Sequence, residues 1–223
     1  MRSGFVVRAV LFDMDGTLID TMDLIAECWS QALKAHGYSV SKEDIYRAAG
    51  LPAVTIMKMY TGVEDPELHS SIRSYANKCF EERLKSKDLL FPRVKETLLE
   101  LKKNGLLLGV ATSSSCKRAR ALLAQAGVAE LFDVVQCLEE GMSGKPEPDV
   151  LVAAIKKLGV SPREAIYVGD SLVDCIAASN AGVKFVLVAR SWSSTSSILG
   201  SGCGVLAVIE DVAELPRVLK QAP

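Results

Sequence analysis

Short apolar runs recur along the chain, and most of them are separated by segments with the apolar spacing of helices. The first run, Phe5–Phe12, is rich in Val and Phe and predicts a strand that is buried on both faces. Strands of this kind are typical of a parallel sheet, which is covered on both sides. Similar runs follow at Leu106–Ala111, Val134–Leu138, Ala165–Val168, Phe185–Val188 and Val205–Ile209.

Three segments between these runs have helical periodicity and end in glycine, the residue best suited to the left-handed turn after a helix. They are Ser115–Gly127, Pro148–Gly159 and Asp170–Gly182. Strands and helices that alternate in this way form βαβ units. The sequence therefore predicts an α/β fold, a parallel sheet with helices on both faces, in which ligands bind at the carboxyl ends of the strands.

One long segment, from about Asp20 to Asp88, breaks the alternation because its periodicity is helical throughout. We expect its first helix to run from Thr21 to His36, with Asp20 as the N-cap. The pattern predicts an α-helical domain inserted into the α/β domain. The predicted boundaries are 1–18 and 90–223 for the α/β domain and 19–89 for the inserted domain.

Charge and hydropathy narrow the choice of partners. The 223 residues carry a formal net charge of −1, from 26 basic and 27 acidic side chains, which does not favour nucleic acid or an anionic membrane as a partner. No apolar segment approaches the roughly 20 residues that span a bilayer, and Asp13 ends the first apolar run too early for a signal peptide. We expect a cytoplasmic protein that acts on small molecules, as a monomer or a homodimer.

Cysteine and serine usage lead to two further expectations. The six cysteines are scattered without a CxxC pair, and most have apolar neighbours, so we interpret them as reduced core thiols rather than disulfides. The segment Ser193–Gly204 is rich in serine and glycine, which predicts a flexible surface loop. The cysteines are Cys28, Cys79, Cys116, Cys137, Cys175 and Cys203.

Acidic residues gather where two predicted strands end. Asp13 and Asp15 follow the first run, and Asp170 follows the run at Ala165–Val168, with Asp174 one helical turn later. Asp170 by itself would be interpreted as an N-cap. Because the carboxyl ends of parallel strands meet at one edge of a sheet, and Mg²⁺ prefers clustered oxygen ligands, we expect these acids to converge on one Mg²⁺ ion.

Other polar residues suit an anion. Thr112 ends a predicted strand and Ser113–Ser115 begin the next helix, where free N–H groups bind anions, although simple helix capping explains these residues equally well. Lys145 precedes Pro146, which restricts the lysine to extended geometry. A lone lysine is usually a solvated charge, but next to the predicted acids it would neutralise charge.

Four motifs occur in a characteristic order: DMDGT at Asp13–Thr17, the strand end at Thr112, GKPEPD at Gly144–Asp149 and VGDSLVD at Val168–Asp174. In this order, with the helical insert directly after the first, they resemble the motifs of the haloacid dehalogenase superfamily. The resemblance implies a Rossmann-like core with an inserted helical cap. It also implies phosphoryl chemistry through an aspartyl-phosphate.

The resemblance implies a role for each motif residue. Asp13 would be the nucleophile, and Asp15 would be the general acid that protonates the leaving oxygen and then the base that activates water. Mg²⁺ would be held by the Asp13 carboxylate, the backbone carbonyl of Asp15 and Asp170, with Asp174 as a further ligand or a support. The phosphoryl oxygens would be held by three other groups: Thr112, the amide of Ser113 and Lys145.

Individual residues favour one branch of this superfamily. Asp15 argues against the dehalogenases, which lack an acid at that place. Ile25 stands where the β-phosphoglucomutases have a histidine, and Ala48–Thr55 lacks the lysine of the phosphonoacetaldehyde hydrolases. Signalling receiver domains rank last because they lack the helical insert. We predict a Mg²⁺-dependent phosphatase for a small phosphorylated metabolite, with a phosphomutase or an inorganic pyrophosphatase as the alternatives.

Substrate choice is expected to depend on the inserted domain, above all on Gly50–Val54, which are small and apolar. Arg47 and Lys58 are basic residues nearby that would suit a second anionic group. For both we favour a solvated position on a helix.

Overall fold

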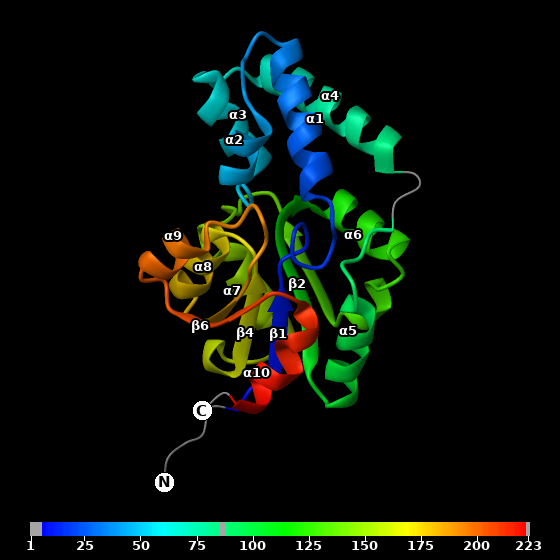
Figure 1. Ribbon diagram of the computed structural model, residues 1–223, viewed down its shortest axis with the longest axis vertical. Coiled ribbons are helices and arrows are strands. Elements are labelled where there is room, and N and C mark those ends of the chain that lie inside the picture. Colours follow the sequence, from blue (N-terminus) through cyan, green and yellow to red (C-terminus); the bar gives the residue numbers. More distant parts are fainter. Residues whose placement is uncertain (1–5, 85–87, 222–223) are drawn as a thin grey trace.

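Among the described residues, 6–84 and 88–221 of this computed structural model, a six-stranded parallel sheet forms the centre of the fold (Figure 1). The strand order is β3-β2-β1-β4-β5-β6, so β1 lies inside the sheet. The prediction of an α/β fold with a parallel sheet is confirmed. The bounds are β1 (Ala9–Phe12), β2 (Leu107–Ser115), β3 (Val134–Leu138), β4 (Ala165–Gly169), β5 (Lys184–Val188) and β6 (Val205–Ile209).

Each predicted apolar run overlaps one of these strands, but the first strand is shorter than expected. It begins at Ala9, whereas the prediction began at Phe5, which lies outside the described residues. Val6 is 66% exposed, so it takes no part in the buried sheet. The four residues of β1 are fully buried because β2 pairs with one of its edges and β4 with the other.

Helices cover both faces of the sheet, with α5 and α6 on one side and α7 and α8 on the other (Figure 1). Side chains alternate along a strand, so Val10 and Phe12 pack into one apolar core while Ala9 and Leu11 pack into the other. Helices α6, α7 and α8 confirm the three predicted helices that end in glycine. The bounds are α5 (Val94–Lys103), α6 (Cys116–Gln125), α7 (Asp149–Leu158), α8 (Leu172–Asn180), α9 (Thr195–Gly200) and α10 (Leu215–Gln221).

The segment Ser193–Gly204 is not a simple flexible loop, so that prediction is wrong. It contains helix α9, whose Ile198 is buried in the core, and Cys203 after the helix is bonded to Cys175 of α8. Burying one isoleucine contributes about 1.5–3 kcal/mol, which is enough to anchor a short helix despite its serine-rich sequence.

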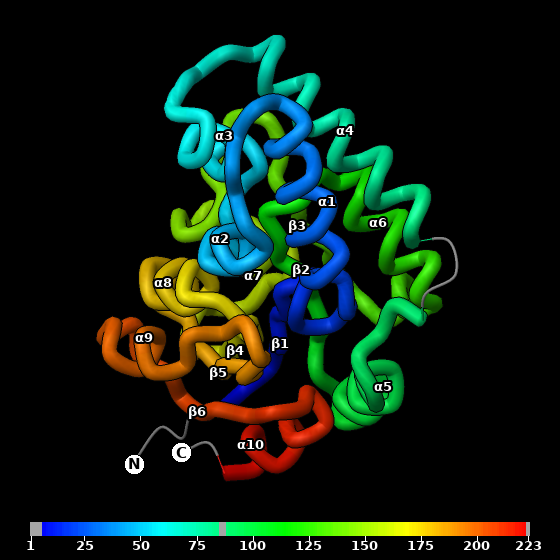
Figure 2. The backbone as a smooth tube through the Cα atoms, turned by 45° about the horizontal axis from the view of Figure 1, so that its top comes forward, coloured from blue at the N-terminus to red at the C-terminus, as the bar shows by residue number. Residues whose placement is uncertain are grey.

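In the described part of the chain, four helices lie between β1 and α5 and stand over the carboxyl ends of the strands (Figures 1 and 2). All four contribute to an apolar cluster of their own, which includes Leu33, Ile45, Ile56 and Ile72 in chain order. Residues 22 to 84 contain no strand, as the helical periodicity predicts. The bounds are α1 (Met22–Ala35), α2 (Lys42–Arg47), α3 (Ala53–Thr61) and α4 (Pro66–Leu84).

Helix α1 begins one residue later than expected, and the prediction that Asp20 is its N-cap is wrong. The N-cap is Thr21, and its hydroxyl does not cap the helix but donates to Oδ1 of Asp15 at 2.5 Å. Asp20 belongs to the extended connection before the helix, where its backbone N–H donates to the carbonyl of Leu89 at 2.8 Å. Tertiary pairing of the connection therefore overrides the local capping preference.

Two connecting segments run side by side between the sheet and the helices α1–α4. Ile19 pairs with Leu90 in an antiparallel bridge, and the N–H of Phe91 donates to the carbonyl of Leu18 at 3.1 Å. The four helices are thus joined to the α/β part by a paired double connection, a geometry that suits a hinge. The domain boundaries at 18/19 and 89/90 stay a prediction.

The cysteines are paired, so their interpretation as reduced thiols is wrong for this structure. Disulfides join α1 to α4, the first residue of α6 to β3, and α8 to the turn after α9, with Cα–Cα distances of 5.6, 5.2 and 5.7 Å. The partners are 51, 21 and 28 residues apart in sequence, so their spacing carries no sign of the pairing. The pairs are Cys28–Cys79, Cys116–Cys137 and Cys175–Cys203.

Reduction of these bonds is expected to lower stability, because each bond restricts the unfolded chain and typically contributes about 2–4 kcal/mol. Thiol titration of the denatured protein should find no free thiol before reduction and six afterwards. The denaturant midpoint should fall when a reductant is present. Six titratable thiols without reductant would instead support the reduced state.

Over residues 6–84 and 88–221, no helix is both long enough and apolar enough to cross a membrane. The disulfides bear on the expected cytoplasmic location. Disulfides are typical of oxidising compartments, with the proteins of hyperthermophiles as an exception. The location stays a prediction.

Candidate active site

The candidate site lies where β1 and β4 end next to each other. Phe12 pairs with Val168 in the sheet, and the backbone N–H of Asp13 donates to the carbonyl of Val168 at 2.8 Å. Asp13 and Asp170 follow these two strands and are 4% and 1% exposed. Parallel pairing of adjacent strands therefore brings together two acids that are far apart in the sequence.

The chain leaves β1 through a tight turn at Gly16, which has a φ of +87°. A Cβ atom at this position would lie 2.5 Å from Oδ2 of Asp170, so only glycine allows the turn to approach that carboxylate. The turn is held from the other side by Arg190, whose Nε donates to the carbonyl of Gly16 at 2.9 Å. The guanidinium of Arg190 in turn lies 3.6 Å from the ring centre of Phe91.

Lys145 is the buried cation of the site. Its side chain is 1% exposed, and Nζ donates to Oδ1 of Asp13 and to Oδ1 of Asp174, both at 2.6 Å. A third bond, at 3.1 Å, goes to the hydroxyl of Tyr167. Burial alone would lower the pKa of Lys145, but the charges of Asp13 and Asp174 outweigh it and raise the pKa above its usual value. Lys145 is therefore charged at neutral pH.

The pKa values of Asp13 and Asp170 are raised as well. Burial is the largest cause that raises the pKa of Asp13 well above its usual value, and repulsion from Asp174 and Asp170 adds to it while Lys145 opposes it. Burial and the charge of Asp174 raise the pKa of Asp170 to about 7, against the hydrogen bonds from Trp192 and Thr17. The single positive charge of Lys145 therefore does not balance the negative charges of all three acids.

The acids can hold a divalent cation. One oxygen each of Asp13, Asp170 and Asp174 lies within 4.8 Å of the others. When ionised, the three carboxylates and one lysine leave a buried charge of −2, which a divalent cation would balance. Hard carboxylate oxygens are the donors that Mg²⁺ prefers, so the residues present fit this ion.

The three acids differ in the oxygens that remain available. Oδ1 of Asp174 accepts from Lys145 and Oδ2 accepts from the backbone and hydroxyl of Ser171, so both oxygens are engaged. Asp170 accepts one bond on each oxygen. Asp13 uses Oδ1 for Lys145, and among the described residues no hydrogen bond reaches its Oδ2. Asp13 therefore keeps an oxygen for chemistry at the edge of the cavity.

The residues expected to bind phosphoryl oxygens lie beside the acids. Thr112 is buried, and Ser113 accepts a hydrogen bond on Oγ from the backbone N–H of Lys145 at 3.2 Å. Strand β2 continues to Ser115, so Ser113–Ser115 do not begin the helix as expected. Ser115 is the N-cap of α6 but its side chain makes no capping bond, which leaves simple capping without support. The structure thus brings Thr112, Ser113 and Lys145 together.

Asp15 lies apart from the acid cluster and is paired with Arg118 of α6. The two guanidinium N–H₂ groups donate to its two oxygens at 2.6 and 2.9 Å, and Thr21 and Ser114 donate as well, Ser114 at 3.3 Å. Burial would raise the pKa of Asp15, but the charge and hydrogen bonds of Arg118 more than offset it, so the pKa lies below its usual value. Asp15 is therefore ionised in this arrangement.

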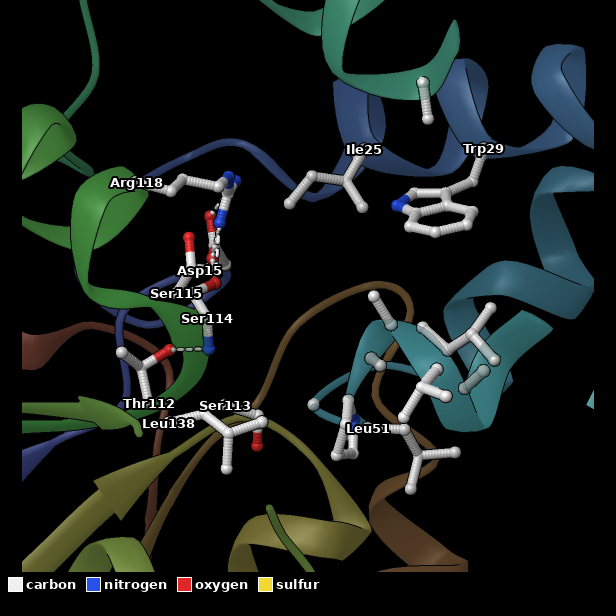
Figure 3. A pocket seen from close by; sticks show the side chains of 18 of the residues that line it. Asp15, Ile25, Trp29, Leu51, Thr112, Ser113, Ser114, Ser115, Arg118 and Leu138 are labelled. Carbon is white, nitrogen blue, oxygen red and sulfur yellow. Dashed lines mark hydrogen bonds and ion pairs between the residues drawn. The ribbon is translucent and has the colours of Figure 1, made fainter. Parts of the chain in front are cut away.

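A cavity of about 660 Å³ lies between the strand ends and the helices α1–α4 (Figure 3). Asp15, Thr112, Ser113, Ser114 and Arg118 form one wall. The opposite walls come from the helices and include Ile25, Trp29 and Leu51. The cavity is large enough for a small metabolite.

The loop before α3 reaches the α/β part. All five residues of Gly50–Val54 line the cavity. The ring of Pro52 packs so closely on Gly144 that a Cβ there would lie 2.4 Å from it. Arg47 and Lys58 do not line the cavity and instead pair with acidic residues at the surface, which agrees with the solvated positions expected for them.

Sequence reasoning missed four residues that support the motif side chains. Arg118 donates hydrogen bonds to Asp15, and the hydroxyl of Tyr167 accepts one from Lys145. Trp192 and Thr17 each donate a hydrogen bond to Asp170. Arg118 lies one helical turn after Ser114, a spacing that could have placed it at the same sheet edge. No local pattern marks Trp192 or Tyr167.

The comparison with known families agrees with the motifs and the geometry. Residues 10–188 match the family described as haloacid dehalogenase-like hydrolase. The chain belongs to this family. The resemblance of the four motifs to the haloacid dehalogenase superfamily is therefore confirmed, and so is the Rossmann-like fold.

Individual members of the family that resemble this chain carry different names. Pyrophosphatase PpaX of Bacillus velezensis is 33% identical over 184 residues, covering 82% of this chain and 83% of its own. Phosphoglycolate phosphatase of Photorhabdus laumondii is 30% identical over 197 residues, covering 86% and 84%. The solved structure of β-phosphoglucomutase from Clostridium difficile superposes with a TM-score of 0.83 over 97% of this chain and 98% of its own, at 16% identity, which shows a shared fold alone.

Proposed function

We propose that this protein is a Mg²⁺-dependent phosphatase that hydrolyses a small phosphomonoester through an aspartyl-phosphate on Asp13. The observation that carries the proposal is the convergence of Asp13, Lys145, Asp170 and Asp174 at the strand ends, where Asp13 and Lys145 line a metabolite-sized cavity. Relatives named as phosphatases support the same reaction class. The helices α1–α4, which stand over the strand ends, support it as well (Figure 1), and we propose that residues 19–89 form a cap over the site.

Charge neutralisation is the main task of the site. A phosphate monoester resists attack by a carboxylate because both are negative, so the attack needs cations around the phosphoryl group. Lys145 contributes one positive charge in direct contact with Asp13. Mg²⁺, held by Asp13, Asp170 and the backbone carbonyl of Asp15, would supply the rest of the charge stabilisation. Asp174, with both oxygens engaged, orients Lys145 instead of binding the metal directly.

Asp15 serves the proton transfers. Oδ2 of Asp13 attacks phosphorus, the leaving oxygen takes a proton from Asp15, and Asp15 later accepts a proton from the water that hydrolyses the aspartyl-phosphate. Thr112, the Ser113 amide and Lys145 hold the phosphoryl oxygens. In the pair with Arg118, Asp15 is ionised, which is the form required of the base in the second step. Asp15 therefore has to take up a proton before it can act as the acid in the first step.

The apolar walls argue against a phosphomutase. A mutase must rebind its intermediate in a second orientation, and the superfamily branch that does so has a histidine where this chain has Ile25. Ile25 lies in the cavity wall next to Trp29, where it offers no proton or hydrogen bond. Hydrolysis of pyrophosphate remains the alternative, since the chain resembles a relative named as a pyrophosphatase as well as one named as a phosphoglycolate phosphatase.

A phosphatase screen tests the proposal. Purified protein with Mg²⁺ would be offered several dozen phosphorylated metabolites, pyrophosphate and an aryl phosphate, and released phosphate would be measured with and without EDTA. We expect turnover of at least one compound that EDTA abolishes. A folded, Mg²⁺-loaded protein that is inactive on the whole panel would contradict the proposal, and isomerised product without phosphate release would indicate a mutase.

Without a divalent cation, the stability of the protein is expected to fall as the pH rises from about 4 to about 7. The pKa of Asp170 is about 7 in the folded state and about 3.9 in an unfolded chain, so the folded state binds more protons across this window. Raising the pH therefore favours unfolding. Thermal unfolding in EDTA at pH 5 and at pH 8 measures the effect.

Mg²⁺ should reverse this trend, because it takes the place of the proton in the acid cluster. We expect Mg²⁺ to raise the melting temperature more at pH 8 than at pH 5, and Asp170→Asn to remove most of the difference. Stability in EDTA that rises steadily from pH 5 to pH 8 would show that the cluster does not hold the protons assigned to it.

A further inference from the structure

The helices α1–α4 contribute polar side chains to the cavity lining that have no partner of their own. They are Trp29 of α1 and Arg73 and Asn77 of α4. Within residues 6–84 and 88–221, none of these side chains takes part in a hydrogen bond or an ion pair. All three can donate hydrogen bonds, through an indole N–H, a guanidinium and an amide, and only Asn77 can also accept one. The helices thus present a set of unused donors to the cavity.

Arg73 and Asn77 lie on the side of α4 that lines the cavity, together with Phe80. The three positions are four and three residues apart, so they share one side of the helix. The ring centre of Phe80 lies 4.7 Å from the guanidinium carbon of Arg118, next to Asp15. Arg73 precedes Phe80 by about two helical turns, or about 10 Å along the axis, in the part of α4 that lies farther from the sheet (Figure 1). Arg73 is therefore remote from the acids.

Arg73 also differs from the other cations of the cavity. Lys145 and Arg118 line the cavity as well, but both form ion pairs with carboxylates of the site. Arg73 is exposed at the cavity wall and forms no ion pair with another described residue. A guanidinium binds a carboxylate through two parallel hydrogen bonds. The unpaired guanidinium therefore suits an anionic group of a bound molecule.

We propose that Arg73, with Asn77 and the indole N–H of Trp29, binds a carboxylate on the leaving group of the substrate. The inference rests on the proposed phosphatase function and names its substrate class, a phosphomonoester that carries a carboxylate at the end remote from the phosphate. Ile25 and the ring of Trp29 line the space between, where they suit an apolar or ring-shaped body (Figure 3). A carboxylate directly next to the phosphate, as in phosphoglycolate, does not meet this separation.

Glu140 is the charged lining residue that favours the opposite choice, an ammonium group. It lies between β3 and α7 and forms no ion pair with another described residue, whereas its neighbour Glu139 pairs with Lys157. One carboxylate on the α/β side stands against three donors on the helices. The donors favour a carboxylate, and an ammonium analogue belongs to the test.

Three aryl phosphates test the substrate class. They are the phosphate esters of para-hydroxyphenylpropionic acid, of its amide and of para-hydroxyphenylpropylamine. The phenol that leaves is closely similar in all three, so only the charge of the remote group differs. The measured quantity is kcat/KM in the presence of Mg²⁺. We expect the acid to exceed the amide by about 10-fold, because a hydrogen-bonded charge is recognised more strongly than a neutral amide, and the amine to be the slowest.

Variants assign the preference to the donors. Arg73→Met should lower the ratio of acid to amide to near one, because methionine fills similar space but cannot pair with a carboxylate. Arg73→Lys should keep part of the ratio. Trp29→Phe, which keeps a ring but lacks the N–H, should lower the ratio less than Arg73→Met does. Lys78→Met is the matched control, since it removes one positive charge from an exposed position of α4 outside the cavity lining, and it should leave the ratio unchanged.

Several results would overturn the carboxylate site while leaving the phosphatase function intact. They are equal kcat/KM for acid and amide in the wild-type protein, faster hydrolysis of the amine, and an Arg73→Met variant that keeps the full ratio. An equal fall of the ratio in Lys78→Met would do the same, because the preference would then reflect general charge. So would a protein that hydrolyses other phosphates but none of the three esters. A folded, Mg²⁺-loaded protein that hydrolyses no phosphate at all would instead overturn the proposed function.

Discussion

Replacing Asp13 by asparagine is expected to abolish turnover, with kcat lower by on the order of 10⁴-fold or more. The amide keeps the shape of the side chain but lacks the nucleophilic oxygen, so no phosphoryl group can be transferred to residue 13. Lys145, Thr112 and Ser113 remain in place to bind phosphate. The measurement is phosphate release over several hours from a substrate that the wild-type protein hydrolyses.

The same substitution should leave the protein folded. Burial and neighbouring carboxylates raise the pKa of Asp13, which means that its charged form is costly in the folded state. A neutral amide avoids this cost, while Lys145 keeps Asp174 as a partner. We expect the urea midpoint of Asp13→Asn in EDTA to be no lower than that of the wild-type protein. A folded variant that retained more than a few per cent of the activity would contradict the role of Asp13.

Replacing Lys145 by methionine is expected to remove activity and also to lower the free energy of unfolding by about 3–5 kcal/mol at pH 8. Methionine fills similar space but leaves the buried carboxylates of Asp13 and Asp174 without their shared cation. Urea denaturation measures the loss. It should be smaller at pH 5, because Asp13 and Asp170 then take up protons and the uncompensated charge falls.

Lys157 provides the control for this variant. It lies on α7 and forms an ion pair with Glu139 at 3.5 Å, with side chains 51% and 46% exposed. Solvent screens such a pair, so Lys157→Met should change the free energy of unfolding by less than about 1 kcal/mol. Equal effects of Lys145→Met and Lys157→Met would show that the buried lysine does not balance the acid cluster.

The paired lysine also explains why the acids can be gathered at all. Three carboxylates within 4.8 Å oppose one another, and the structure offsets this with Lys145, with the indole of Trp192 and with the hydroxyls of Thr17 and Ser171. The indole N–H donates to Asp170 at 2.8 Å, and its ring stacks on Tyr46 of α2 at 6.0 Å between centres. The guanidinium of Arg118 likewise lies 4.7 Å from the ring centre of Phe80 in α4. The helices above the strand ends therefore contact the supports of both Asp15 and Asp170.

Three acidic residues near the N-terminus show which side-chain settings can be predicted from the sequence and which cannot. Asp13, Asp15 and Asp20 look alike in the sequence, but they serve three different settings. Asp13 belongs to the cluster with Lys145, Asp15 to the pair with Arg118, and Asp20 to the extended connection next to Leu89. The DMDGT motif predicts different roles for Asp13 and Asp15, because each has its own position in the motif. Local propensity predicts that Asp20 caps a helix, but backbone pairing with the distant Leu89 places it in the connection instead.

Features that depend on a local pattern of residues can be predicted from the amino-acid sequence. Apolar runs marked the six strands, helical periodicity marked the inserted segment, and acids after the first and fourth strands predicted one sheet edge. These predictions succeed because a buried strand needs continuous apolar residues, and because parallel strands place their carboxyl ends together. The four ordered motifs then identified the family without any knowledge of distances.

Contacts between residues that are far apart in the sequence are seen only in the tertiary structure. It joined six cysteines into three pairs, anchored a serine-rich segment through Ile198, and brought Arg118, Tyr167 and Trp192 to the motif side chains. None of these contacts leaves a local signature, because a disulfide, a buried side chain or an ion pair depends on separations in space that spacing along the chain does not encode.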